Sequence, residues 1–342
     1  MERKLQLARK IVPDLADELV KRYRILKTVR LMEPCGRRPV VLSLGMTERT
    51  VRSEIEKLNA QGLIRVSKTG MMVTEEGKEV LEGLHTMFST LTGLTELEEK
   101  MTALTGAKKV LLAQGNSDES ERTRKEMAQL GARVLLEILK KSSRIAIAGG
   151  STMAELVEAM PVMTIPKAAM VVPARGSVGR RLELQADTLA AKLAGKLDAD
   201  YRMLHLPDNL SSKVLEEMRE EPEIAETILE MKQASILLLG VGNALEMAEK
   251  RRLHEEVYVY LQEKQAIAEA CGYYFDHNGD VVYETNSIGI HADDIRRMET
   301  VIISAGGAKK ADSLLALSKT MKNAIYIMDE EAAYRMLEKS ES

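Results

Sequence analysis

The feature that most constrains the fold of this chain is a series of short apolar runs spaced through residues 106–342 and separated by helical patterns. Near-continuous apolar runs of this length are typical of strands that are buried on both faces. Strands that alternate with helices form an open, mostly parallel sheet covered by helices. We therefore predict an α/β, Rossmann-like body with strands over Val110–Ala113, Arg144–Ala148, Ala168–Val172, Arg202–Leu206, Ser235–Leu239, Val301–Ser304 and Ala324–Met328.

Amphipathic patterns lie between most of these runs. They predict helices over Glu121–Lys141, Arg181–Leu197 and Ala308–Lys319. Sheets of this class bind their ligands just beyond the carboxyl ends of the strands. The residues that follow each strand are therefore the first place to look for chemistry.

Composition restricts the class of protein to which the chain can belong. Its 342 residues suggest about two domains, and 45% hydrophobic with 30% charged residues is typical of a globular protein. The two cysteines, Cys35 and Cys271, cannot form a disulfide scaffold, and zinc-type Cys/His clusters are absent, so we expect no metal site. The charged N-terminus does not resemble a signal peptide, and no apolar stretch is long enough to span a membrane. We expect a cytoplasmic protein.

The net charge of −3 conceals an uneven distribution along the chain. Residues 1–88 hold 17 basic and 12 acidic side chains, and within them residues 21–68 hold 12 basic against 4 acidic ones. A basic N-terminal part on an acidic body is typical of a protein that binds an anionic polymer, because phosphate neutralisation supplies most nonspecific affinity for DNA. A basic surface that only faces solvent would show the same charge count. The local sequence pattern must therefore distinguish DNA binding from a solvated surface.

The beginning of the chain predicts two helices. Pro13 begins a helical pattern that ends before Pro34, and Pro39 begins a short second helix that runs to Leu44. Gly45 then supplies the tight turn that a helix-turn-helix unit requires.

A third helix and a hairpin complete this part of the chain. Thr47 can cap the helix, and its buried stripe is formed by Val51, Ile55 and Leu58. Runs at 63–66 and 71–73 predict a hairpin with a basic, glycine-containing tip, and Thr74 can cap a further helix. Together, the three helices, the hairpin and the further helix predict a winged helix-turn-helix over residues 1–88.

The third helix of such a unit enters the major groove of double-stranded DNA. We expect base contacts from the exposed side chains near its start, which are Arg49, Thr50, Arg52 and Ser53. We expect phosphate contacts from the basic side chains just before the second helix and in the hairpin, which are Arg37, Arg38, Arg65 and Lys68. Winged helices also serve as protein-interaction modules, but the basic third helix and hairpin tip favour operator DNA.

Residues 89–105 form the expected linker helix to a body over residues 106–342. Leucines spaced by three or four through residues 78–105 form an apolar seam. The seam is compatible with a dimer contact and equally with packing on the body of the same chain.

Four predicted strand ends carry turns that suit an anion. Gly149, Gly150, Ser151 and Thr152 follow one strand and begin a helix, where backbone N–H groups and the helix dipole attract phosphate. Arg175 follows the next strand, and Gly240-Val241-Gly242 precedes Lys250 and Arg251. Gly306 and Gly307 precede Lys309 and Lys310. Each turn alone is weak, but together they predict a ligand with two phosphates.

Several strings in this sequence resemble one family along essentially the whole chain. They are Glu33-Pro34-Cys35-Gly36-Arg37-Arg38, Gly149-Gly150-Ser151-Thr152, Pro173-Ala174-Arg175-Gly176, Gly272-Tyr273-Tyr274-Phe275 and Ala305-Gly306-Gly307. With the winged head, they are similar to the SorC/DeoR-type sugar-responsive repressors, in particular those that control glycolytic operons.

The resemblance implies a repressor whose effector is fructose 1,6-bisphosphate and whose body has the sugar-phosphate isomerase/deaminase fold without the activity. It implies a first phosphate site at Gly149, Gly150, Ser151 and Thr152, with Lys250 and Arg251 nearby. Arg175, Gln185 and Lys310 would meet the rest of the ligand, and Glu269 would accept bonds from sugar hydroxyls. Paired heads on one operator also imply a homo-oligomer, a dimer or a tetramer.

An enzyme is the alternative function. A sugar-phosphate isomerase or deaminase would need a base, for which Glu269 or a histidine is available. His205, His277 and His291 are scattered, and none stands in a recognisable dyad with a carboxylate. We therefore expect no catalytic residues and no cofactor other than the effector.

Overall fold

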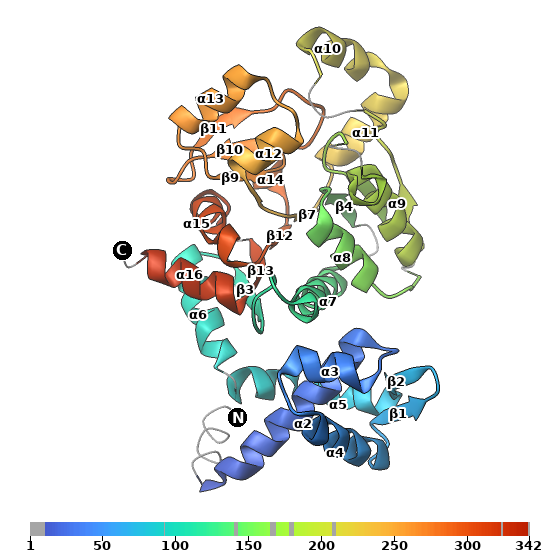
Figure 1. Ribbon diagram of the computed structural model, residues 1–342. Helices are drawn as coiled ribbons and strands as arrows, with labels where there is room; N and C mark the ends of the chain where they lie inside the picture. The colour runs from blue at the N-terminus through green and yellow to red at the C-terminus, as the bar shows by residue number, and fades with distance from the viewer. Residues whose placement is uncertain are drawn as a thin grey trace. The chain divides into compact units, whose positions relative to one another are not determined.

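A computed structural model describes residues 11–91, 93–139, 143–164, 169–177, 181–206, 210–322 and 324–340. The chain divides into two compact units. The first unit contains the residues up to Leu97 and a short piece at 120–122, and the second contains Glu98–Glu119 and the residues from Thr123 onward. Figure 1 shows the elements of each unit.

The first unit is the winged helix-turn-helix that the sequence predicts. Its elements are α2 (Pro13–Met32), α3 (Arg37–Leu44), α4 (Glu48–Ala60), β1 (Ile64–Ser67), β2 (Gly70–Val73) and α5 (Glu75–Leu91). The expected caps are present, since Thr47 Oγ1 accepts the Thr50 N–H at 3.2 Å and Thr74 Oγ1 accepts the Gly77 N–H at 3.1 Å. The second helix begins at Arg37, two residues before the predicted Pro39.

The core of the first unit joins all its elements. Ile25, Val29, Val51, Ile55 and Met71 are almost fully buried in one apolar cluster. A charged side chain of α4 is buried as well. Glu54 of α4 is 4% exposed, and its carboxylate accepts bonds of 2.7 Å from Arg22 Nε of α2 and from Lys57 Nζ. This arrangement fixes α4 against α2 by charge as well as by apolar packing.

The hairpin is anchored to the segment that follows α2. Cys35 exchanges both backbone hydrogen bonds with Met71, at 2.8 and 3.2 Å, so this segment adds a short third edge to the β1–β2 pair. The Glu33 carboxylate accepts the Val73 N–H at 2.6 Å. The hairpin therefore has a fixed position on the helices of its own unit.

The second unit contains a seven-stranded parallel sheet in the order β3-β13-β12-β7-β4-β5-β6. Its strands are β3 (Lys109–Ala113), β4 (Arg144–Ile147), β5 (Met170–Pro173), β6 (Asp200–Tyr201), β7 (Ile236–Leu239), β12 (Thr300–Ser304) and β13 (Ile325–Asp329). Alternate strand residues pack with α7 (Glu121–Ile138), α8 (Ser151–Ala159) and α9 (Ala186–Leu197) in one apolar cluster. The strand residues between them are also buried, so the sheet is covered on both faces. This is the predicted Rossmann-like body.

The remaining helices connect or cover the sheet. They are α6 (Leu94–Thr105), α10 (Ser212–Glu220), α11 (Pro222–Lys232), α12 (Ala244–Lys250), α13 (Glu255–Glu263), α14 (Ala292–Arg297), α15 (Ala311–Thr320) and α16 (Glu330–Ser340). In α6, Met101 is fully buried and the Glu98 carboxylate accepts the Leu112 N–H of β3 at 2.8 Å. This end of the predicted linker therefore packs on its own chain. Lys140 and Lys141, within the helix predicted over Glu121–Lys141, and Ala168 lie outside the described residues.

One predicted strand is wrong. The residues Arg202–Leu206 are not a strand; the sheet ends with the two-residue β6 just before them. The reason is a buried carboxylate, because Asp187 accepts the N–H groups of Leu204 at 2.7 Å and of His205 at 3.3 Å. His205 also has a positive φ of 53°, which ends the extended backbone.

A second sheet was not predicted. It is antiparallel, in the order β11-β10-β9-β8, and consists of β8 (Gly242–Asn243), β9 (Ala268–Ala270), β10 (Tyr273–Phe275) and β11 (Val281–Glu284). These strands have two to four residues each, too short for a clear alternation in sequence. The sheet carries the Gly-Tyr-Tyr-Phe string and Glu269.

No described helix combines the length and the hydropathy that crossing a bilayer would require.

The Asp329 carboxylate at the end of β13 predicts a large loss of stability when it is removed. It is fully buried and accepts the N–H groups of Ser117, Gly307 and Ala332 at 2.6–2.8 Å. The Asp329→Ala variant leaves these three donors buried without an acceptor, so urea denaturation should show a free energy of unfolding lower by about 3 kcal/mol or more.

The matched control for Asp329→Ala is Asp312→Ala, measured at the same protein concentration. Asp312 forms an exposed pair with Lys339, and its removal should cost less than about 1 kcal/mol. Equal stability of the two variants would contradict the structural role of Asp329.

Candidate functional site

The eight side chains that the sequence assigns to DNA, six of them basic, lie on the surface of the first unit. Seven of the eight are exposed, and they are Arg37, Arg38, Arg49, Arg52, Ser53, Arg65 and Lys68, while Thr50 is half-buried. Arg49 and Thr50 lie in the first turn of α4, directly after its cap. Arg52 pairs with Glu56 at 3.0 Å, an exposed contact that costs little to exchange.

The only buried acid of α4 does not weaken this face. Glu54 is neutralised by Arg22 and Lys57 on the side of the helix that packs on α2. The exposed side of α4 carries Glu48 and Glu56 beside its arginines, and it is Arg37, Arg38, Arg65 and Lys68 on the neighbouring elements that make the surface positive, as contact with DNA phosphates requires.

In the second unit, the order in which the chain adds strands to the parallel sheet reverses between β4 and β7. The chain runs outward from β4 to β5 and β6 on one side and from β7 to β12 on the other. The carboxyl ends of two such neighbours form the crevice in which sheets of this class hold ligands. Gly149 and Gly150 follow β4 at this point, and Gly240 follows β7.

Helix α8 begins in this crevice without a side-chain cap. Its N-cap is Gly150, which has a φ of 120° and a ψ of 163° that only glycine adopts readily. Ser151 is exposed and Thr152 half-buried in the first turn. The free N–H groups of a first turn, with two hydroxyls beside them, form a site for an anion.

Gln185 lies directly against this turn. Its backbone neighbour Leu184 accepts the Gly150 N–H at 2.8 Å, and a Cβ on Gly149 would lie 2.7 Å from the Leu184 carbonyl oxygen. Glycine is therefore required at 149, because any side chain would displace the start of α9. The structure brings Gln185 and residues 149–152 together.

A hydroxyl that the sequence analysis did not single out lies along the same edge. The pairing of Ile147 with Leu238 and of Ile303 with Leu239, continued along the strands, places Gly149, Gly240 and Ser304 side by side. Ser304 Oγ is buried, and it has no hydrogen-bond partner within the described ranges. Two neighbouring glycines leave room beside it.

Arg175 is buried under the antiparallel sheet. Its guanidinium donates to the Cys271 carbonyl, to Thr285 Oγ1 at 2.5 Å and to Ser287 Oγ. Gly272 leaves the space for it, since a Cβ there would overlap the guanidinium. Arg175 therefore connects the end of β5 to the second sheet.

Arg251 and Glu269 form a buried ion pair. Arg251 Nη2 donates to Glu269 Oε1 at 2.7 Å, and both side chains are 5% exposed. The same oxygen accepts the Gly272 N–H at 2.6 Å. Glu269 thus holds a guanidinium and the turn that surrounds Arg175, which brings these two predicted residues and Arg175 into one cluster.

Lys310 lies near this cluster. Its ammonium is 3.8 Å from Glu246 Oε2 at the start of α12, and its side chain is 25% exposed. Burial lowers the pKa of Lys310, Glu246 opposes that shift, and the positive charge of Lys250 adds to it. A half-buried cation with an exposed carboxylate as partner is ready to accept an anionic ligand.

Two of the four glycine turns are occupied by the protein itself. Gly307 donates its N–H to Asp329 at 2.8 Å, and a Cβ on Gly306 would contact Ser117 Oγ at 2.6 Å. The first turn of α12 is capped by the Asn243 side chain. These turns shape the edge, but their N–H groups are not the anion site that α8 provides.

Within the described ranges, no group of three or more His, Cys, Asp or Glu side chains is placed to hold a metal ion.

Two family profiles match the chain. The CggR N-terminal DNA binding domain matches residues 19–88, and a "Putative sugar-binding domain" matches residues 89–338. The second match covers more than half of the chain.

Full-length relatives match along both units. The central glycolytic genes regulator of Priestia megaterium is 36% identical over 335 residues, which are 97% of this chain and 98% of the relative. The central glycolytic genes regulator of Bacillus subtilis is 35% identical over 337 residues, 98% of this chain and 99% of the relative. These relatives are transcriptional regulators, so the enzymatic alternative is excluded.

Solved structures show the same architecture. A SorC family transcriptional regulator from Enterococcus faecalis superposes with a TM-score of 0.67 at 32% identity, covering 71% of this chain and all but 1% of its own. The full-length sorbitol operon regulator SorC of Klebsiella pneumoniae, 18% identical, shares the fold over 92% of this chain and 98% of its own, with a TM-score of 0.64. The chain therefore belongs to the central glycolytic genes regulator family, within the SorC/DeoR group of DNA-binding transcriptional regulators that carry a sugar-binding domain.

Proposed function

We propose that this regulator represses a glycolytic operon and that fructose 1,6-bisphosphate lowers its affinity for the operator. The observation that carries the proposal is the uncapped, glycine-led start of α8 in the crevice between β4 and β7. The names of the full-length relatives support the target genes. The cations beside the crevice support a ligand with more than one negative charge.

The first phosphate would bind at residues 149–152, on the free N–H groups of the first turn of α8 and on the hydroxyls of Ser151 and Thr152, while the Gly150 N–H stays bonded to the Leu184 carbonyl. The second would bind Lys310 and Lys250, with Gln185 and Arg175 beside the sugar. Arg251 and Glu269 would meet the sugar hydroxyls or a phosphate oxygen as one unit, because their ion pair is already formed. Ser304 Oγ adds a hydroxyl without a partner in the described structure at this edge.

An anionic ligand exchanges contacts that the free protein makes internally. Lys310 would leave Glu246, and the cluster around Glu269 would adjust to the new charge. Because that cluster holds the second sheet, binding changes the shape of the body and hence how two copies meet. A coupling of about 1–3 kcal/mol, a 5- to 150-fold loss of operator affinity, is typical of such linkage.

The proposal is tested by titrating fructose 1,6-bisphosphate against the full-length protein on a labelled operator fragment. We expect release of the DNA at submillimolar effector, with fructose 6-phosphate much weaker because it lacks the second phosphate. Unchanged DNA binding at millimolar fructose 1,6-bisphosphate would contradict the proposal.

The Glu246–Lys310 pair predicts a variant with tighter effector binding. In Glu246→Gln the ammonium of Lys310 loses its competing carboxylate, so calorimetry should show an affinity for fructose 1,6-bisphosphate raised about threefold. Glu249→Gln, on the same helix and also exposed, removes the same charge away from Lys310 and is the control. Equal affinities of the two variants would contradict the contact.

The basic face predicts two kinds of DNA-binding defect. Arg49→Ala removes a side chain from the first turn of α4 and should cost about 1–3 kcal/mol with a relaxed sequence preference. Lys68→Ala, at the hairpin tip, should weaken binding equally for all sequences and reduce the salt slope by about one. Fluorescence anisotropy at several salt concentrations separates the two.

Lys78→Ala is the control for both DNA-binding variants, since Lys78 pairs with Glu75 on α5 outside the basic face. A specificity change in Lys68→Ala and none in Arg49→Ala would reverse the assignment.

A further inference from the structure

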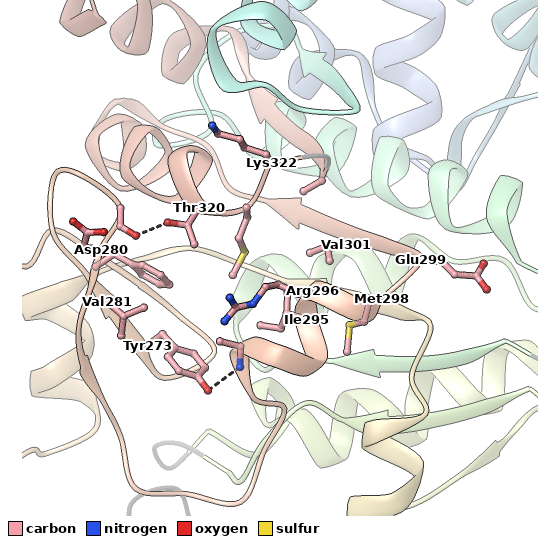
Figure 2. A pocket seen from close by; sticks show the side chains of 15 residues that line it. Tyr273, Asp280, Val281, Ile295, Arg296, Met298, Glu299, Val301, Thr320 and Lys322 are labelled. Carbon is pink, nitrogen blue, oxygen red and sulfur yellow. Dashed lines mark hydrogen bonds between the residues drawn. The ribbon is translucent and has the colours of Figure 1, made fainter.

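A pocket of about 660 Å³ opens in the second unit at the amino ends of β12 and β13, away from the carboxyl edge described above (Figure 2). Its apolar floor is formed by side chains that are 2–9% exposed, which are Phe275, Val301, Met321 and Ala324. This volume lies within the range of small-molecule sites, and the walls above the apolar floor also carry charged side chains, which are Asp280, Arg296, Glu299 and Lys322.

The walls of the pocket are tied together by hydrogen bonds. The Ala292 N–H at the start of α14 donates to the Tyr273 hydroxyl of β10 at 3.0 Å, and Thr320 Oγ1 at the end of α15 donates to the Gly279 carbonyl. Figure 2 shows both bonds on opposite sides of the pocket. The pocket is therefore formed before any ligand arrives.

The charged group over the pocket is a guanidinium. Figure 2 shows Arg296 directed between Tyr273 and the floor, whereas the carboxylates of Asp280 and Glu299 and the ammonium of Lys322 point away. Arg296 Nη2 is 2.9 Å from Asp293 Oδ1, in a pair whose side chains are 73% and 77% exposed. An exposed pair of this kind is easily exchanged for a ligand carboxylate, which binds a guanidinium with two parallel bonds.

We propose that this pocket is a second ligand site, which takes a compact aromatic or branched aliphatic carboxylate. The apolar body of the ligand lies on Phe275 and Met321, and its carboxylate binds Arg296. This chemistry differs from that of the carboxyl edge, where polar groups and cations suit a phosphorylated sugar.

The antiparallel sheet connects the two sites. Successive side chains of β10 point to opposite faces, so Tyr273 and Phe275 line the pocket while Tyr274 lies opposite Glu269 in the register with β9. Glu269 holds Arg251 and the Gly272 turn. A ligand that moves β10 therefore alters the effector site, and this coupling rests on the proposed function.

The site is tested with the full-length protein and the fluorescent aromatic anion 8-anilinonaphthalene-1-sulfonate. Benzoate should displace this probe, and benzamide, its neutral isostere, should be about tenfold weaker. Displacement by both compounds at equal concentration, or by neither, overturns the carboxylate site.

Two variants locate the binding. Arg296→Gln should lower the benzoate affinity about tenfold, whereas Arg297→Gln, its exposed neighbour on α14 outside the pocket lining, should leave it unchanged. Val281→Trp places a large side chain at the exposed rim and should abolish probe binding while thermal unfolding stays unchanged. Unaltered probe binding in Arg296→Gln and Val281→Trp overturns the proposal. So does a change of oligomeric state in Val281→Trp, which would make a second copy the occupant.

The coupling is measured separately, as the dissociation constant of fructose 1,6-bisphosphate with and without saturating benzoate. A shift of about threefold or more is expected, and Arg296→Gln should remove it. No shift overturns the coupling and leaves the site standing. Absence of effector binding in both conditions would instead overturn the proposed function, while benzoate binding would remain measurable.

Discussion

Two buried guanidinium groups hold the antiparallel sheet in place: Arg175 connects it to the end of β5, and Arg251 binds Glu269 within the sheet's own segment. Burying a charge is costly unless it is paired, and here Arg251 has Glu269 while Arg175 has a carbonyl and two hydroxyls. The same sheet buries only a small apolar cluster of its own around Tyr274. The bonds of Arg175 to the turn at Cys271 and to Thr285 and Ser287 therefore help to fix where this sheet lies relative to the end of β5.

The proposed effector site uses side chains that already have partners within the protein. The groups that would recognise an anionic sugar are also groups that stabilise the protein, so a ligand must compete with internal carboxylates before it gains any contact. Glu246 beside Lys310 is such a competitor, whereas Glu269 keeps its bond to Arg251 and takes part in the site with it. The affinity is then set by the difference between two sets of charged contacts, and a small rearrangement of the sheet can shift it considerably.

The parts of the structure that depend on local pattern were predictable. The caps by Thr47 and Thr74 and the buried parallel strands follow from residues a few positions apart. The antiparallel sheet was missed because its strands are very short and one of them, Ala268–Ala270, has a charged residue at its centre.

The remaining errors share one cause, which is a carboxylate whose partners are distant in sequence. Asp187 ended the strand expected at Arg202–Leu206, and Asp329 took the N–H of Gly307 that seemed available for phosphate. Glu54, which the sequence pattern did not single out, is a further buried carboxylate, and its partner Arg22 is 32 residues away. Sequence spacing contains no information on such contacts. For the candidate site, the structure brings residues 149–152 and Gln185 together, whereas the internal bonds of Arg175 were not foreseen.

The anchoring of the hairpin limits how control can be exerted on DNA. Cys35 and Glu33 bind the hairpin to the segment after α2, and Glu54 binds α4 to α2 itself. Helix α4, which is expected to contact bases in the major groove, and the hairpin, which is expected to contact DNA phosphates, therefore move together. Under the proposed function, the effector would not weaken one kind of contact and spare the other, and with paired heads on one operator it would act on the separation or tilt of those heads. Operators whose half-sites are moved apart by one or two base pairs should then imitate the induced state without any sugar.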